Sequence, residues 1–410
     1  MGTPRASAEP RDGSRGAAAW PDPVIGLRNH IPLGAPATRE PVDGTERFLR
    51  VSLGFTPRWF RERLGIDFSE PWHADPAYRA GSLLAMKRHL HECFPLVPYF
   101  RPVVDDGIER TCWTLSGVNG IMTIPRLYGI EPRFAIDGWP DARDGMHIPR
   151  EEIPVDRPVD LDRHPVLADL YRQIAVIRER SGPVHGYPNY QGLLNVALKV
   201  RGNDIFLDLV DDPDWVHRFL RHIAETISAV SRRIQALQRA SGFAVDLLSM
   251  SNCVMNMVSP GQYEEFVLPL DRGLGGRFPR FGVHTCNWKA DPYLESLRKI
   301  PRMGYLDTGI DSDLERMREM FPDTRRAVLY GPVQLEAKSL SDLAVDFRRI
   351  AELAGPCDLV LADVEATTGD ERVRDALRLA AELDREFLDG GGAPGAAGAE
   401  GAGAGGAGRP

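Results

Sequence analysis

The hydrophobic and polar positions of this chain follow two alternating patterns. In the first, apolar residues recur every three or four positions, which is typical of helices that bury one side. This pattern predicts helices over residues 57–64, 77–91, 165–180 and 213–240. In the second, short apolar runs lie between turn residues, which predicts strands buried on both faces. These runs cover residues 243–250, 281–283, 303–306, 327–330 and 358–362.

The amino-terminal third of the chain shows weaker patterns. Residues 45–53 are predicted to be helical, and residues 96–104, which are rich in β-forming side chains, are predicted to be the first strand. Residues 120–137 contain strand-like pieces interrupted by glycine and proline. Residues 144–163 are polar and punctuated by proline, which predicts an insertion or a long loop.

The alternation of strand, loop and helix predicts an α/β fold with a parallel sheet of about eight strands. The ordered length exceeds the roughly 250 residues of a bare barrel. We therefore expect a (β/α)8 TIM-like barrel with N-terminal helical additions. A doubly wound open sheet is the alternative, but no Gly-x-Gly-x-x-Gly motif follows any predicted strand.

The composition changes at both ends of the chain. Residues 1–44 are rich in Pro, Gly, Ala and Arg without a repeat, which predicts a disordered segment or one draped over the core. Residues 389–410 are almost entirely Gly, Ala and Pro, and they bury too little apolar surface to offset their chain entropy. We expect a flexible tail there and a single barrel domain over residues 45–388.

The overall composition disfavours several functional classes. A net charge of −8 argues against nucleic-acid binding through bulk positive charge. The chain has no run of about 18 apolar residues and no apolar region typical of a signal peptide, so neither a membrane span nor secretion is predicted. The five cysteines are odd in number and scattered, which fits a reducing cytoplasm better than a disulfide framework.

A candidate metal motif follows the predicted strand 281–283. His284 and Cys286 are two residues apart, so their side chains point to the same side of an extended chain. An imidazole nitrogen and a sulfur together suit Zn²⁺ better than Mg²⁺ or Ca²⁺, which prefer oxygen. The motif lies at a strand-to-loop junction, where α/β enzymes keep their chemistry. The alternative is a buried cysteine beside a hydrogen-bonded histidine.

Several segments resemble the uroporphyrinogen decarboxylase superfamily, which includes zinc-dependent corrinoid methyltransferases. The resemblance spans roughly residues 183–383 and is carried by the segments 182–187 (Gly-Pro-Val-His-Gly-Tyr), 206–217 and 258–269. In addition, residues 284–286 match the His-x-Cys zinc motif of the methyltransferase branch. The resemblance implies a TIM-like barrel, a zinc ion and a corrinoid (cobalamin) as methyl donor.

The sequence departs from both branches of that superfamily. The paired-arginine motif with which the decarboxylases bind substrate carboxylates is missing, and its nearest equivalent, Phe100-Arg101-Pro102, has one arginine. At the last strand the decarboxylases have Gly-His-Gly and the methyltransferase relatives have a zinc-ligating cysteine. This chain has Asp363 and Glu365 there. The methyltransferase branch is therefore the better match, but the third zinc ligand is open.

Two residues are candidates for that third ligand. Glu365 ends the last predicted strand, where the relatives have a ligand; its alternative role is to cap the next helix or to pair with Arg372. Cys253 follows the strand 243–250 and is expected at the same barrel mouth, with burial as a small apolar side chain as its alternative role. Cys357 precedes its strand and is expected at the opposite face, away from the metal.

Six other residues near predicted strand ends are candidates for catalysis or substrate binding. The catalytic candidates are His185, Tyr187 and Asp307. The candidates for substrate contact are Asn252, Trp288 and Tyr293. For Asp307 the specific expectation is that it orients His284 or binds substrate. The other candidates have structural alternatives, namely a hydrogen-bonded histidine, a turn or capping role, or aromatic packing.

The sequence thus supports three functional hypotheses. The first is a cytoplasmic zinc-dependent methyltransferase that activates a thiol-type acceptor, with a corrinoid, either free or on a separate corrinoid protein, as donor. The second is a decarboxylase of a tetrapyrrole or another polycarboxylate, although the missing arginine pair argues against uroporphyrinogen. The third is a non-catalytic barrel that binds a metal or a tetrapyrrole. No nucleic-acid or membrane partner is expected, and the pattern does not indicate an oligomeric state.

Overall fold

The computed structural model describes residue 33 and residues 48–389. The predicted amino-terminal segment 1–44, apart from residue 33, and the predicted tail from residue 390 onward therefore lie outside the described residues. Leu33 is buried and forms a parallel bridge with Phe55.

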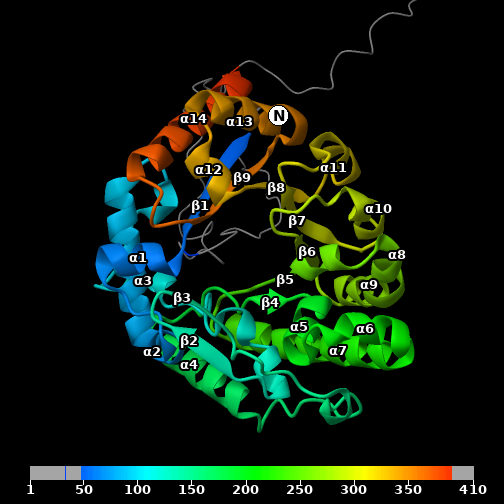
Figure 1. Cartoon of the computed structure of the whole chain (residues 1–410). Helices are drawn as coiled ribbons and strands as arrows, with labels where there is room; N and C mark the ends of the chain where they lie inside the picture. The colour runs from blue at the N-terminus through cyan, green and yellow to red at the C-terminus, as the bar shows by residue number, and fades with distance from the viewer. Residues whose placement is uncertain (1–32, 34–47, 390–410) are drawn as a thin grey trace, which may run out of the picture.

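The core is a seven-stranded sheet in which all pairs are parallel. In their order across the sheet, the strands are β1 (Leu49–Phe55), β9 (Cys357–Val364), β8 (Arg325–Tyr330), β7 (Met303–Gly309), β6 (Arg280–His284), β5 (Leu247–Ser251) and β4 (Tyr190–Gln191). The first and last strands of the chain are neighbours, as in a barrel opened along one seam. In Figure 1 the strands curve around the centre of the molecule and the helices lie outside them.

The predicted parallel α/β architecture is therefore confirmed, whereas closure into a (β/α)8 barrel stays a prediction. Within the described part of the chain, no ladder joins β4 to β1. Between these strands in the sequence, Thr114 and His185 form an isolated parallel bridge, and Leu115 N donates to the His185 carbonyl over 2.9 Å. These contacts pair two short segments, around Thr114 and His185, of the kind that could lie between β4 and β1 in a closed barrel.

The helices follow the strands and cover the outside of the sheet (Figure 1). They are α1 (Pro57–Leu64), α2 (Glu70–Ala74), α3 (Pro76–Cys93), α4 (Pro165–Ser181), α5 (Leu193–Arg201), α6 (Asp204–Asp211), α7 (Pro213–Ala240), α8 (Pro260–Gln262), α9 (Leu268–Arg277), α10 (Leu294–Leu297), α11 (Leu314–Met320), α12 (Pro332–Ala337), α13 (Leu340–Ala354) and α14 (Asp370–Asp389). Helix α7 begins as its sequence predicts, because the Asp212 side chain accepts from Trp215 N.

Two predictions for the amino-terminal part were wrong. Residues 45–53 were expected to be helical, but Leu49–Phe55 is β1, and all seven of its residues are buried beside β9. A short apolar run does not distinguish a helix from a buried strand, and here the sheet partner decides. Residues 96–104 were expected to be the first strand, but they contain a single 3₁₀ turn, Pro98–Phe100. The prolines at 98 and 102 lack the N–H groups that a ladder needs.

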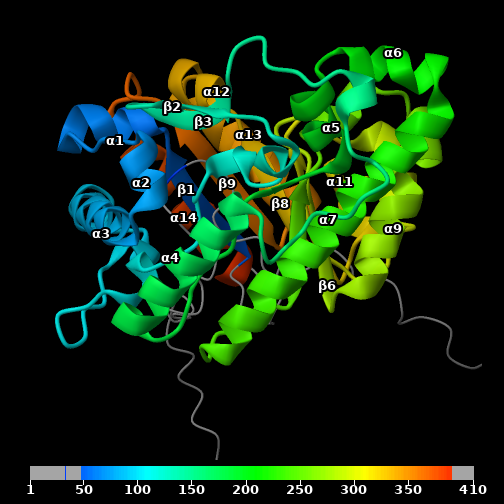
Figure 2. The same ribbon diagram turned by 90° about the horizontal axis from the view of Figure 1, so that it is seen from below.

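The segment between α3 and α4 contributes one short hairpin and one long loop. Strands β2 (Pro132–Ala135) and β3 (Gly138–Ala142) pair in antiparallel fashion beside α1, at the end of the molecule where α12 also begins (Figure 2). Residues 144–163 form the predicted loop, interrupted by one 3₁₀ turn. The hairpin therefore lies near the carboxyl ends of the central strands.

The amino ends of β1, β8 and β9 are joined by a buried ionic cluster. Asp358 accepts from Arg50 Nε and Nη2, both over 2.9 Å, and from Arg325 Nε over 2.8 Å. All three side chains are buried. Cys357 lies at this same end, and burial raises the pKa of its thiol to about 12. Cys357 therefore lies at the end of the sheet opposite the candidate metal motif, as predicted.

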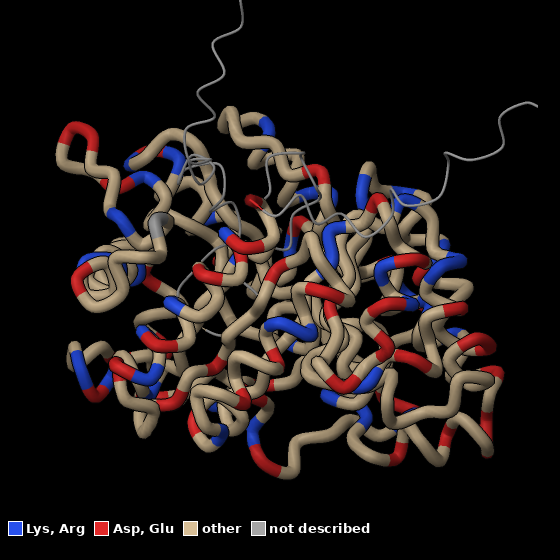
Figure 3. Tube along the Cα trace, turned by 90° about the horizontal axis from the view of Figure 1, so that it is seen from above, with Lys and Arg blue, Asp and Glu red and all other residues tan. Residues whose placement is uncertain are grey.

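The surface carries both signs of charge. Figure 3 shows basic and acidic positions interspersed along the trace, in keeping with a net charge of −8. No helix among the described residues is long and apolar enough to cross a membrane.

Candidate metal centre

Three side chains that can bind a metal meet just beyond the carboxyl ends of β5 and β6. These strands pair so that Ser251 lies opposite His284. Cys253 follows β5 by two residues and Cys286 follows β6 by two residues, so the chain leaves both strands toward the same place. The ligand atoms of Cys253, His284 and Cys286 all lie within 4.8 Å of one another. Cys286 Sγ is 3.1 Å from His284 Nε2.

A buried carboxylate sets the orientation of the His284 ring. Asp307, on β7, is fully buried, and its Oδ2 lies 2.6 Å from His284 Nδ1. Its other oxygen accepts from Thr285 N over 2.8 Å, and Tyr305 OH donates to Oδ2 over 2.8 Å. Because the carboxylate accepts the Nδ1 proton, Nε2 is left with its lone pair on the side of the cysteines. This is the arrangement that metal-binding histidines have in proteins.

The backbone at Cys286 adopts a conformation that non-glycine residues rarely use. Its φ is 62°, in the left-handed region. The following residue, Asn287, lies tightly over the ends of the next two strands: a Cβ added at Gly309 would be 2.6 Å from the Asn287 carbonyl oxygen, and one at Gly331 would be 2.9 Å from Nδ2. These two glycines therefore let the loop pass close to β7 and β8 and turn Cys286 toward His284.

The environment of Cys253 favours its thiolate form. Hydrogen bonding with Cys286 lowers the pKa of the Cys253 thiol well below its usual range, and the His284 ring adds to this effect against the opposing effect of burial. Cys253 and Cys286 are both partly accessible to solvent, whereas His284 is buried. The cluster therefore combines two partly buried cysteines with one fixed imidazole.

The carboxylates of the last strand do not belong to this cluster. Glu365, the first candidate for the third ligand, is exposed, and its Oε2 accepts from Thr56 Oγ1 over 3.4 Å. Asp363 interacts electrostatically with His284. Desolvation raises the pKa of the Asp363 carboxyl, the His284 ring opposes this rise, and the charge of Glu365 adds to it. Asp363 has a φ of 52° and lies where the register of β1 and β9 shifts. Of Glu365 and Cys253, the two candidates for the third ligand, the structure places Cys253 beside His284 and Cys286.

Two candidate catalytic residues, His185 and Tyr187, pack against other aromatic rings. The ring of His185 packs against Phe243, with centroids 4.5 Å apart, and Phe243 precedes β5 whereas the candidate ligand Cys253 follows it. Burial lowers the pKa of His185 to about 4. Tyr187 is buried and stacks with Tyr190 at 6.3 Å. The pairing with β5 begins only at Tyr190, five residues after His185, and a catalytic role for His185 and Tyr187 stays a prediction.

The three candidates for substrate contact have different surroundings. Asn252 is buried, and its Nδ2 donates to Asp271 Oδ2 over 3.0 Å. Tyr293 is buried, and its hydroxyl donates to the Val258 carbonyl over 2.6 Å. Both side chains thus support the loop around Cys253. Trp288 is 53% exposed, so contact with a substrate stays a prediction for this residue.

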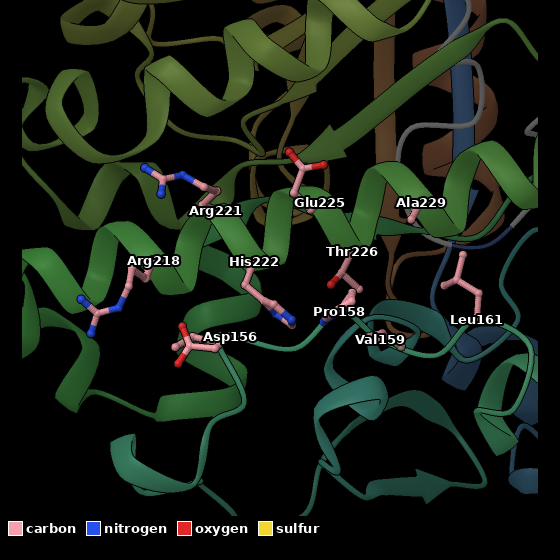
Figure 4. Close-up of a pocket in the computed structure, with 11 residues that line it drawn as sticks. Asp156, Pro158, Val159, Leu161, Arg218, Arg221, His222, Glu225, Thr226 and Ala229 are labelled. Atoms are coloured by element: carbon pink, nitrogen blue, oxygen red, sulfur yellow. The ribbon is translucent and has the colours of Figure 1, made fainter.

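A separate pocket of about 480 Å³ lies between α7 and the loop 155–161. Figure 4 shows His222 pointing from α7 toward this loop. Its Nε2 is 2.7 Å from the Arg157 carbonyl oxygen and its Nδ1 is 2.8 Å from Tyr128 OH. Both ring nitrogens are thus hydrogen-bonded, and Nε2 holds the loop on the helix. This pocket shares no residue with the metal cluster.

Comparison with known proteins supports the fold. No protein-family model and no curated protein matches the chain. Among solved structures, a methyltransferase from Methanosarcina mazei is similar, with a TM-score of 0.55 and 14% sequence identity over 84% of this chain and 95% of that chain. At this identity the likeness shows a common fold. It extends over nearly the whole of the other protein.

Asp307→Asn is expected to weaken zinc binding about 10- to 100-fold, the range typical of residues that orient a metal ligand. An amide has one oxygen, so it cannot accept from Thr285 N and His284 Nδ1 in the way that the two carboxylate oxygens do. Competition with a chelator would measure the affinity, and circular dichroism would check that the variant is folded. A folded variant with unchanged affinity would show that the carboxylate does not hold the ring for a metal.

Proposed function

We propose that this protein is a zinc-dependent methyltransferase that transfers a methyl group to a thiol-type acceptor. The observation that carries the proposal is the convergence of Cys253, His284 and Cys286 at the carboxyl ends of adjacent parallel strands. The likeness in fold to a protein described as a methyltransferase supports it. Active sites of barrel enzymes lie at this end of the sheet.

The donor set fits zinc rather than a harder cation. Two sulfurs and an imidazole nitrogen are ligands that Zn²⁺ accepts, whereas Ca²⁺ and Mg²⁺ take oxygen. A catalytic zinc site has three protein ligands and one open position, which matches the three residues of this cluster. When bound, zinc supplies a positive charge that keeps an acceptor thiol in its thiolate form at neutral pH.

The protein's own residues would position the acceptor and the ligands. Asp307 fixes the His284 ring, and the acceptor would approach from the side on which Cys253 and Cys286 are partly accessible to solvent. In the transfer, the acceptor sulfur forms a bond to the methyl carbon, and the electron pair of the broken methyl–donor bond stays with the donor. A methylated corrinoid, free or on a partner protein, is the donor that we propose, with the reaction taking place in the cytoplasm.

The proposal is tested by incubating the zinc-loaded protein with methylcobalamin and a panel of small thiols. We expect a methyl thioether product by mass spectrometry and a matching loss of the methylcobalamin spectrum. The His284→Ala variant and the chelator-treated protein should form no product above background. Thioether formation that survives both treatments, or its absence with the zinc-loaded protein for every thiol and methyl donor tried, would contradict the proposal.

Uroporphyrinogen is expected to be a poor substrate, with turnover far below about 1 s⁻¹, the low end of typical enzyme rates. A ligand with many carboxylates needs several basic partners. The nearest equivalent of the family's paired-arginine motif has only Arg101, which is exposed beside the Pro98–Phe100 turn. Measuring coproporphyrinogen formation by chromatography tests this expectation. Turnover at or above that rate would favour the decarboxylase hypothesis.

A further inference from the structure

The loop that carries Cys253 is held by buried contacts on several sides. Asn252, the first loop residue, donates its backbone N–H to the His284 carbonyl over 2.7 Å. Val254 N donates to Asn195 Oδ1 over 3.0 Å, and the Val258 carbonyl accepts from Tyr293 OH. Cys253 thus lies between two anchored neighbours, and its sulfur position depends on how they are held.

The most deeply buried of these anchors involves a carboxylate that no part of the proposed reaction uses. Asp271, on α9, is fully buried, and its Oδ2 accepts both from Asn252 Nδ2 over 3.0 Å and from Tyr263 OH over 2.8 Å. Tyr263 is also fully buried and begins the π-helical turn Tyr263–Val267. A π-turn inserts an extra residue into a helix, which is common near functional sites.

The packing around Asn252 allows little movement. A Cβ added at Gly192 would lie 1.9 Å from Asn252 Oδ1 and 2.9 Å from the Ser251 carbonyl oxygen. Gly192 N in turn donates to that same carbonyl over 2.7 Å. The amide of Asn252 is therefore confined between the start of α5 and Asp271, which accepts from its Nδ2.

We propose that Asp271, with Tyr263, is a positioning residue for the candidate metal centre: it fixes Asn252 and thereby places the sulfur of Cys253 beside His284 and Cys286. The inference rests on the proposed zinc site and adds a residue that touches neither the ligands nor a substrate. The two hydrogen bonds to Asp271 Oδ2 restrict the positions of Asn252 and Tyr263, and ligand sites need such support to about half an ångström.

Asp271→Leu removes the acceptor at similar size, so it is expected to weaken Zn²⁺ binding about 10- to 100-fold in a folded protein. In the Co²⁺-substituted protein, the sulfur-to-cobalt charge-transfer absorption should lose the contribution of Cys253 and resemble that of Cys253→Ser. Asp271→Asn retains one oxygen that can accept both bonds and should restore affinity and spectrum. Chelator competition and absorption spectroscopy with the metal ions alone provide these readouts without an activity assay.

A matched pair of variants separates positioning from general stability. Tyr263→Phe and Tyr128→Phe each remove one buried hydroxyl. The hydroxyl of Tyr263 bonds Asp271, whereas that of Tyr128 bonds His222 near the pocket between α7 and the loop 155–161. Only Tyr263→Phe should alter zinc affinity and the cobalt spectrum. Unchanged metal binding in Asp271→Leu, or an equal loss in Tyr128→Phe, would overturn the inference. A wild-type protein that binds no zinc would instead overturn the proposed function.

Discussion

Replacing Cys253 or Cys286 with serine is expected to weaken zinc binding by more than about 100-fold, beyond the loss typical of residues that only support a ligand. Each change removes one of the two sulfurs that lie beside His284 Nε2. Because serine is a poor ligand at neutral pH and nearly preserves size, the loss should reflect coordination and not folding. Zinc content after purification and chelator competition measure the effect.

Two controls sharpen this experiment. Cys112→Ser changes a thiol that is buried outside the cluster, where burial raises its pKa to about 12, and it should leave zinc affinity unchanged. Glu365→Gln should do the same, because Glu365 is exposed and bonds Thr56. A larger loss of zinc affinity in Glu365→Gln than in Cys253→Ser would indicate that Glu365 is a ligand and would contradict the cluster of Cys253, His284 and Cys286.

Asp358→Ala is expected to destabilise the protein by about 3–5 kcal/mol, the cost typical of leaving buried charges without their partner. Arg50 and Arg325 would keep their charges at the amino ends of β1 and β8 while losing the carboxylate that joins them. Urea or guanidinium unfolding measures the change in the free energy of unfolding.

An exposed ion pair provides the comparison. Glu295→Ala removes the partner of Arg316 on the surface and should cost about 0–1 kcal/mol. The folded fraction of Asp358→Ala should still bind zinc, because the ionic cluster and the metal ligands lie at opposite ends of the strands. A loss for Asp358→Ala as small as that for Glu295→Ala would show that the cluster contributes little to stability.

Much of the architecture could be predicted from local sequence. The apolar runs that became β6, β7, β8 and β9 lie between turn residues, and the helices between them have clear start signals. The helix 213–240 was predicted with the bounds that it has in the structure. These segments were predictable because burial on both faces of a parallel strand, or on one side of a helix, leaves a pattern in the residues themselves.

The regions that were predicted wrongly depend on distant partners. Residues 49–55 form a strand because β9, about 300 residues away, provides a parallel neighbour for every residue from Leu49 to Leu53. The place of His185 also depends on a distant partner, because the pairing with β5 starts five residues after it, at Tyr190. The local pattern of apolar residues predicts neither the pairing of β1 with β9 nor that of β4 with β5.

For the candidate site, the sequence by itself identified the pair His284 and Cys286 from their ligand types and short spacing. The extended chain that it predicts for them ends at His284, and Cys286 lies beside the imidazole with a left-handed backbone conformation. Only the tertiary structure decided the third member. Cys253 follows β5 and Glu365 follows β9, and of these two strands only β5 is a neighbour of β6 in the sheet. Asp271 likewise acquires its role only when α9 packs under the loop after β5. Contacts between residues far apart in the chain arise from sheet order and helix packing, and these are properties of the whole fold.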